Sequence, residues 1–119
     1  MNALEHLGIT VVQASKEEVR LEMTVADFHK QPYGFVHGGI NGLLIETACS
    51  IGGNCYLSES SFAVGTDLQV SHLRSVQEGT LTVQAFPDKI GKHLHVWQAT
   101  IFCEDKKIAV GRCTLFIQK

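Results

Sequence analysis

A single acidic residue, Glu46, lies within an otherwise apolar stretch of the chain. The segment before it, His37-Gly38-Gly39, places backbone N–H groups at the start of a predicted helix, where free donors and the helix dipole favour negative charge. Such donors can hold a developing oxyanion. Glu46 follows about two turns later, roughly 10 Å along the helix axis. This arrangement suits hydrolysis of an activated acyl group, with the carboxylate as nucleophile or as general base toward water.

The helix that carries Glu46 has two predicted faces. The larger apolar residues recur at helical spacing and predict a core-facing side, made of Ile40, Leu43, Leu44, Ala48 and Ile51. The opposite side carries small or polar residues around Glu46, namely Gly39, Gly42, Ser50 and Gly53, with Cys49 at its border. Small residues would allow a ligand or a second backbone to approach the carboxylate. The alternative is a solvated glutamate on the outside of an amphipathic helix.

The rest of the chain predicts strands. Residues 8–14 and 19–25 are expected to form two strands, with a short helical or irregular lead-in over residues 1–7. After the helix, residues 62–73, 80–88, 93–104 and 108–118 form four further predicted strands, separated by short polar or glycine-containing loops. Short loops favour antiparallel neighbours, so the last strands should form a meander. One long helix with five or six antiparallel strands predicts an α+β architecture in a single domain, residues 1–119.

Composition excludes several classes of function. The chain has 119 residues, 45% of them hydrophobic, and a formal net charge of −2, so a nucleic-acid-binding footprint is not expected. There is no apolar run of membrane-spanning length and no signal-peptide pattern, so we expect a cytoplasmic protein that does not bind membranes. The cysteines are expected to be small reduced core residues because none are spaced as C-x-x-C: Cys49, Cys55, Cys103 and Cys113.

Taken together, these motifs resemble the signature of hotdog-fold acyl-CoA thioesterases. This group includes the Arthrobacter-type 4-hydroxybenzoyl-CoA thioesterases and the bacterial 1,4-dihydroxy-2-naphthoyl-CoA thioesterases. The resemblance runs from about Gly8 to the end of the chain. It is carried by Gln31-Pro-x-Gly-x-x-His37-Gly38-Gly39 with Glu46, Ala63-Val64-Gly65, His72-Leu73-Arg74-Ser75 with Glu78-Gly79, and Val96-Trp97-Gln98. It implies a curved antiparallel sheet wrapped around one central helix.

The resemblance also implies roles for individual residues. Glu46 is expected to be the catalytic carboxylate, and the backbone N–H of Gly38 is expected to polarise the thioester carbonyl. Gln31 and His37 occupy positions that orient the thioester and its leaving group, and Ser50 matches a hydroxyl that helps to hold the hydrolytic water. Without the family motif, an ordinary loop amide, a turn histidine and a helix-packing hydroxyl would explain these three residues.

Contacts to coenzyme A are implied at two further places. Arg74, with His72 as its possible partner, and Lys92 with His93 match nucleotide and phosphate contacts of the family, and arginine can hold phosphate through two parallel hydrogen bonds. This chain departs from the pattern at His93, where relatives carry arginine. Histidine is mostly neutral at pH 7, which weakens that contact. For each of these residues, the alternative is an ordinary solvated polar side chain.

The resemblance implies no metal and no separate cofactor. Coenzyme A enters as part of the substrate. His93 and His95 lie two apart on a predicted strand and so share a face, but no third ligand is evident. The same strand has apolar residues on both faces, which predicts burial by a partner chain. The resemblance implies dimers joined edge to edge, with active sites at the interface, and pairing of dimers into tetramers.

The expected activity is hydrolysis of an acyl-CoA, with aryl or other bulky flat acyl groups preferred because glycines surround Glu46. One alternative is a non-catalytic module that binds acyl-CoA or an acyl carrier in the same cleft. A second is a hotdog dehydratase, which acts on the acyl chain through a catalytic histidine. His37 is available for that chemistry, but its spacing to Glu46 fits hydrolysis better.

Overall fold

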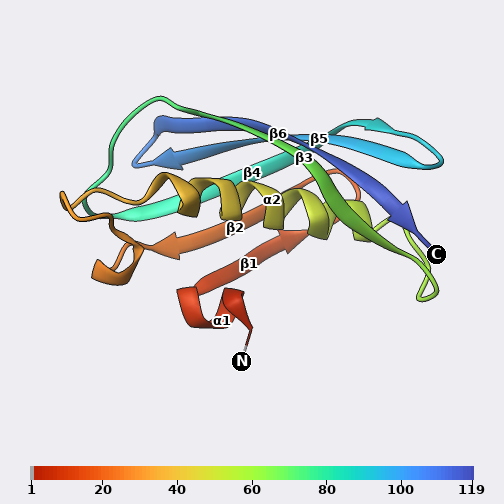
Figure 1. Ribbon diagram of the computed structural model, residues 1–119, viewed down its shortest axis with the longest axis horizontal. Coiled ribbons are helices and arrows are strands. Elements are labelled where there is room, and N and C mark those ends of the chain that lie inside the picture. The colour runs from red at the N-terminus through yellow and green to blue at the C-terminus, as the bar shows by residue number, and fades with distance from the viewer. Residues whose placement is uncertain (1) are drawn as a thin grey trace.

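The computed structural model describes residues 2–119, so Met1, part of the predicted lead-in, lies outside the described residues. A six-stranded antiparallel sheet curves around one long helix, α2 (Gly38–Asn54), which confirms the expected α+β hotdog fold (Figure 1). The strands are β1 (Ile9–Ala14), β2 (Val19–Thr24), β3 (Phe62–His72), β4 (Thr80–Ile90), β5 (Leu94–Cys103) and β6 (Lys106–Gln118). Two short helices complete the chain, α1 (Ala3–Leu7) and the 3-10 turn η1 (Asp27–His29).

The order of strands in the sheet is β1-β2-β4-β5-β6-β3. Strands β4, β5 and β6 are adjacent in this order, which confirms the expected meander. Strands β1 and β3 are therefore the two edges of the sheet. Strand β3, which follows helix α2 in the chain, pairs with β6 (Figure 1). Within residues 2–119, no helix is long and apolar enough to cross a membrane.

The observed strand boundaries differ from the predicted ones by one or two residues, most at β4, which continues to Ile90, and at β6, which begins at Lys106. Turn geometry explains the early start of β6. The sequence predicts that one strand ends at residue 104 and the next begins at residue 108, whereas β5 ends at Cys103 and β6 begins at Lys106. Glu104 and Asp105 both have positive φ, 50° and 69°. Two central residues of this kind make the tight turn that matches strand twist, so Lys106 and Lys107 remain in the ladder.

The apolar face predicted for helix α2 is partly wrong. Leu44 and Ala48 are buried as expected, but Ile40, Leu43 and Ile51 are only half-buried. The buried face is rotated toward residues that pack into the curved sheet: Asn41, Gly42, Leu44, Ile45, Ala48, Cys49, Gly52 and Gly53. Small residues face the core because the sheet wraps closely around the helix. The larger residues Leu43 and Ile51 are thereby left to line a pocket.

A buried histidine predicts how stability depends on pH. His95 is 2% exposed, its Nδ1 has no hydrogen-bond partner within residues 2–119, and burial lowers its pKa. An unfolded histidine titrates near about pH 6.5, so below that pH the unfolded chain binds more protons than the folded chain. The free energy of unfolding should therefore fall as pH drops below about 6.5.

Urea unfolding of the parent protein and of His95→Leu, at about pH 8 and pH 5, measures this effect. The Leu variant should lose less stability on acidification than the parent does. Equal losses in the two proteins would contradict the assignment, because the other histidines are common to both.

Candidate active site

Helix α2 begins at a histidine cap. The N–H of Gly39 donates to Nδ1 of His37 at 2.8 Å, and His37 has the extended backbone of an N-cap residue. Gly39 therefore does not offer a free donor, although the sequence predicted several free backbone donors here. No acceptor within residues 2–119 takes the N–H of Gly38. The structure thus leaves Gly38 as the backbone donor at this helix N-terminus that a carbonyl oxygen could use.

The loop before the helix is held by its own side chains. Oε1 of Gln31 accepts hydrogen bonds from the N–H groups of Tyr33 and Phe35, at 2.5 and 3.3 Å. Buried His29 fixes the start of the loop: its Nδ1 accepts from the N–H of Ala26 at 2.9 Å, and its Nε2 donates to the carbonyl of Leu7 at 2.8 Å. Because the side-chain oxygen Oε1 of Gln31 already accepts these two hydrogen bonds, the side-chain NH₂ is the group that can bind a ligand.

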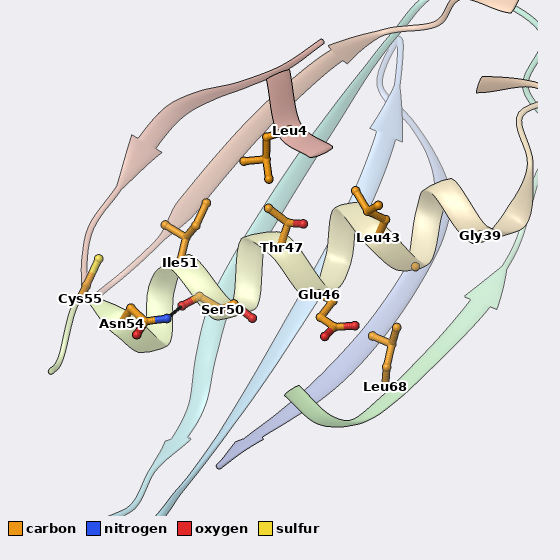
Figure 2. A pocket seen from close by; sticks show the side chains of 11 residues that line it. Leu4, Gly39, Leu43, Glu46, Thr47, Ser50, Ile51, Asn54, Cys55 and Leu68 are labelled. Atoms are coloured by element: carbon orange, nitrogen blue, oxygen red, sulfur yellow. Dashed lines mark hydrogen bonds between the residues drawn. The ribbon is translucent and has the colours of Figure 1, made fainter. Parts of the chain in front are cut away.

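Glu46 lies half-buried on helix α2 and faces the edge strand β3, with Leu68 across from it (Figure 2). Gly65 makes this position possible. A Cβ on Gly65 would lie 2.6 Å from Oε2 of Glu46, closer than any ordinary contact. The β3–β6 register shifts between Gly65 and Asp67, a β-bulge that bends the edge strand beside the carboxylate. In the sequence Gly65 was only part of a motif. The structure shows that the Glu46 carboxylate packs directly against Gly65, in the space that a Cβ would occupy.

Gly65→Ala should therefore displace the Glu46 carboxylate and lower activity without unfolding the protein. We expect a loss of about tenfold or more in kcat/KM, since misplacing a reacting group by about 1 Å can cost about a hundredfold. In a Glu46→Gln background the same substitution should cost little more, because the two residues act through one group. Independent, additive losses would show that Gly65 does not position Glu46.

An open pocket of about 1030 Å³ surrounds Glu46. Figure 2 shows Glu46 and Ser50 on the side of helix α2 toward Leu68, while Leu43, Thr47 and Ile51 lie toward Leu4 of helix α1. The structure thus brings Ser50 into the same pocket as Glu46. Leu4 was missed, although a capping box at Asn2 and Glu5 is a sequence signal for helix α1.

A second cavity, of about 290 Å³, lies at the N-terminus of helix α2. It gathers four of the residues predicted for the site, namely Gln31, Gly38, His72 and Arg74. It also contains Asn41, which the sequence did not identify because a lone polar residue in an apolar helix has no distinctive pattern. Gly38 is adjacent to His72, since a Cβ on Gly38 would lie 3.1 Å from the imidazole Cε1.

Lys92 and His93 are not near these residues within one chain. His72 is opposite Ala109 on β6, whereas Leu94, which follows His93, is opposite Phe116 on the same strand. Seven positions along a strand separate the two points by roughly 24 Å. Both side chains are exposed in the β4–β5 hairpin. One protomer therefore does not assemble all the residues predicted to contact coenzyme A.

The four cysteines differ in burial. Cys49, Cys103 and Cys113 are buried, as expected, whereas Cys55 is half-buried and lines the large pocket. A hydrogen bond with Cys113, together with burial, raises the pKa of the Cys49 thiol. Cys49 is therefore a neutral packing group and not a second nucleophile beside the carboxylate. No cluster of three metal-ligating side chains occurs within the described residues 2–119.

Comparison with known proteins finds one family, which matches most of the chain. The model of the thioesterase superfamily matches residues 33–110. A 1,4-dihydroxy-2-naphthoyl-CoA hydrolase of Listeria monocytogenes is 32% identical over 100% of this chain and 98% of its own length.

Solved structures agree with this result. A thioesterase from Haemophilus influenzae superposes with a TM-score of 0.94 at 35% identity, covering 99% of this chain and 83% of that one. A thioesterase from Staphylococcus aureus, solved as a glutamine-to-alanine variant, superposes with a TM-score of 0.94 at 30% identity, covering 98% of both chains.

Proposed function

Because the chain belongs to the thioesterase superfamily, we propose that it is an acyl-CoA thioesterase, which hydrolyses R–CO–S–CoA to the free acid and CoA. The observation that carries the proposal is the placement of two groups on one helix. The carboxylate of Glu46 lies in a large pocket, and the N–H of Gly38 remains free at the N-terminus of the same helix. An acyl group between them meets a base or nucleophile at one end and a carbonyl-polarising donor at the other.

In the proposed reaction, the Gly38 N–H holds the carbonyl oxygen as negative charge develops on it. Glu46 either takes a proton from water as the water adds to the carbonyl carbon, or adds to that carbon itself and forms an anhydride that water then opens. In both routes the C–S bond breaks and CoA leaves as the thiol. Ser50 is proposed to hold the water, and Gln31 and His37 to orient the thioester.

We propose that the acyl group is aryl or otherwise bulky. Leu43, Ile51, Leu68 and Leu4 supply apolar walls to the pocket, and Gly42 leaves space beside Glu46. The Listeria relative is named for a naphthoyl-CoA substrate, which is a bulky flat acyl group of this kind. CoA esters are intracellular metabolites, so the proposed location of this single-domain enzyme is the cytoplasm.

A homodimer formed through β3 would complete the CoA site. Strand β3 is an edge with exposed apolar residues, Phe62 at 54% and Leu68 at 37%. Edge strands of this kind pair readily with another chain. A two-fold axis between two β3 strands reverses one against the other, so the Phe62 end of one strand lies beside the His72 end of its partner.

The β4–β5 hairpin lies at the Phe62 end of the sheet, because Phe62 is opposite Gln118 and Leu94 is opposite Phe116 on β6. The proposed dimer therefore brings Lys92 of the partner subunit toward His72 and Arg74. His93 of the partner subunit accompanies it. Arg74, the partner's Lys92 and the partner's His93 are the proposed contacts for the phosphates of CoA. His72 is proposed to bind the substrate closer to the thioester, because it lies next to Gly38.

Exposed apolar residues on the outer face of the sheet support a further pairing of dimers into a tetramer. Phe86, Leu94 and Phe116 are 42%, 47% and 40% exposed. Light scattering of the purified protein measures the assembly directly. A monomer at micromolar concentration would overturn both the dimer and the shared CoA site.

The activity test is thiol release from a panel of benzoyl-, hydroxynaphthoyl-, phenylacetyl- and straight-chain acyl-CoA esters, read with a thiol-reactive dye. Faster turnover of aryl esters than of straight-chain esters would support the proposal and its acyl preference. If no ester releases thiol while CoA esters still bind, the protein is a binding module and not a thioesterase.

A further inference from the structure

We propose that Asn41 is a positioning residue, which holds His72 in the tautomer that presents its Nε2–H beside Gly38, where this N–H donates to a carbonyl oxygen of the substrate. The inference rests on the proposed thioesterase function. It adds Asn41, which acts through His72. It also gives His72 the role of a hydrogen-bond donor to a carbonyl oxygen, which differs from contact with a phosphate.

Asn41 is the unexpected residue on the buried face of helix α2. It is 5% exposed and shares that face with Leu44 and Ile45. Its Nδ2 lies 3.1 Å from Nδ1 of His72, and its Oδ1 has no partner within residues 2–119. Burying an incompletely bonded amide is unfavourable, so the hydrogen bond to His72 is the interaction that accounts for an asparagine here.

This contact determines the position of the ring proton. With the Asn41 amide in the orientation seen here, its NH₂ donates to Nδ1 of His72, and a neutral ring with Nδ1 as acceptor carries its proton on Nε2. The charged side chain that lines this cavity is Arg74, whose guanidinium has no acceptor for a hydrogen bond from the ring. Asn41 and Arg74 are therefore both compatible with the neutral ring.

The ring edge that carries this proton is next to the proposed oxyanion donor. A Cβ on Gly38 would lie 3.2 Å from Nε2 of His72 and 3.8 Å from Nδ1, so the Nε2 side of the ring is the one that faces Gly38. A carbonyl oxygen that reaches the Gly38 N–H also comes within reach of this second donor. Both donors line the same cavity at the helix N-terminus.

The first measurement is independent of turnover. Ring ¹⁵N chemical shifts of His72, recorded by NMR in the full-length protein and in Asn41→Leu, report the tautomer. We expect the Nε2–H form in the parent and a mixture of tautomers in Asn41→Leu, a variant of similar shape that should fold. If the tautomer is the same in both proteins, the inference is wrong, whether or not the protein is a thioesterase.

The second measurement follows thiol release from the best CoA ester. Asn41→Leu should lose about tenfold in kcat/KM, less than the roughly hundredfold expected for complete loss of an oxyanion donor in His72→Leu. His72→Gln, whose amide can present an N–H near the position of Nε2, should recover most of that activity. Glu46→Gln in the same assay shows whether the signal depends on the proposed thioesterase site at all.

The double variant separates positioning from packing. If Asn41 acts through the imidazole, Asn41→Leu should cost nothing further when His72 is already leucine. Additive losses would overturn the inference. A fall in kcat would identify the oxygen as the thioester carbonyl, where charge develops in the transition state, and a rise in KM alone would identify an amide carbonyl of the CoA arm. Unchanged kcat and KM in Asn41→Leu would also overturn it.

Discussion

Glu46→Gln should lower kcat/KM for the best acyl-CoA ester by about 10²- to 10⁴-fold, the usual contribution of a general base, or by more if the carboxylate is the nucleophile. Glutamine keeps the size of the side chain but can neither take a proton from water nor attack a carbonyl carbon. The neighbouring Gly65 accommodates a side chain of this shape, so the fold should be retained.

Thiol release with matched concentrations of parent and variant measures the effect, and the thermal unfolding midpoint serves as the control for folding. Ester binding should persist, because the apolar walls of the pocket are unchanged. Turnover within tenfold of the parent, by a folded variant, would show that Glu46 is not the catalytic carboxylate.

Gly52→Ala should be the most destabilising small substitution on helix α2. A Cβ at this position would overlap the six-membered ring of Trp97, with Cζ3 at 2.5 Å and Cζ2 at 2.8 Å. Trp97 is fully buried, so its ring cannot move out of the way. Overpacking of this kind costs roughly 1–3 kcal/mol or more, and outweighs the gain of about 1 kcal/mol from helix propensity.

Gly42→Ala is the matched control on the same helix. Its Cβ would lie 3.5 Å from Cδ2 of Leu68 and 3.9 Å from Cγ2 of Val70, which are ordinary contacts. Alanine there should raise the free energy of unfolding by about 0.5–1 kcal/mol. Urea unfolding of both variants measures the difference, and destabilisation of equal size at the two positions would contradict the packing argument.

The sequence alone determined the class of the fold. Alternation in residues 19–25 predicted strand β2, because a strand with one buried face repeats every second residue. Proline, glycine and polar clusters marked the loops between the strands. Local patterns are sufficient here because secondary structure and turn chemistry depend mainly on near neighbours in the chain.

The sequence alone also placed the main elements of the candidate site. His37-Gly38-Gly39 and Glu46 are parts of one helix, so their separation follows from helix geometry. Their functional roles could be inferred from the resemblance. The His37 cap was not anticipated: the ring bonds the N–H of Gly39, which leaves Gly38 as the free donor.

Contacts between distant segments were decided by the tertiary structure. The curvature of the sheet turned Asn41 and Gly52 toward the core and left Leu43 and Ile51 at the pocket, because the space between a helix and a curved sheet sets which residues fit. The β3 edge brought Gly65 to Glu46 across 19 positions of the chain. It also placed His72 against Gly38 and Asn41. Sequence periodicity describes each element separately, whereas the catalytic geometry depends on how those elements pack together.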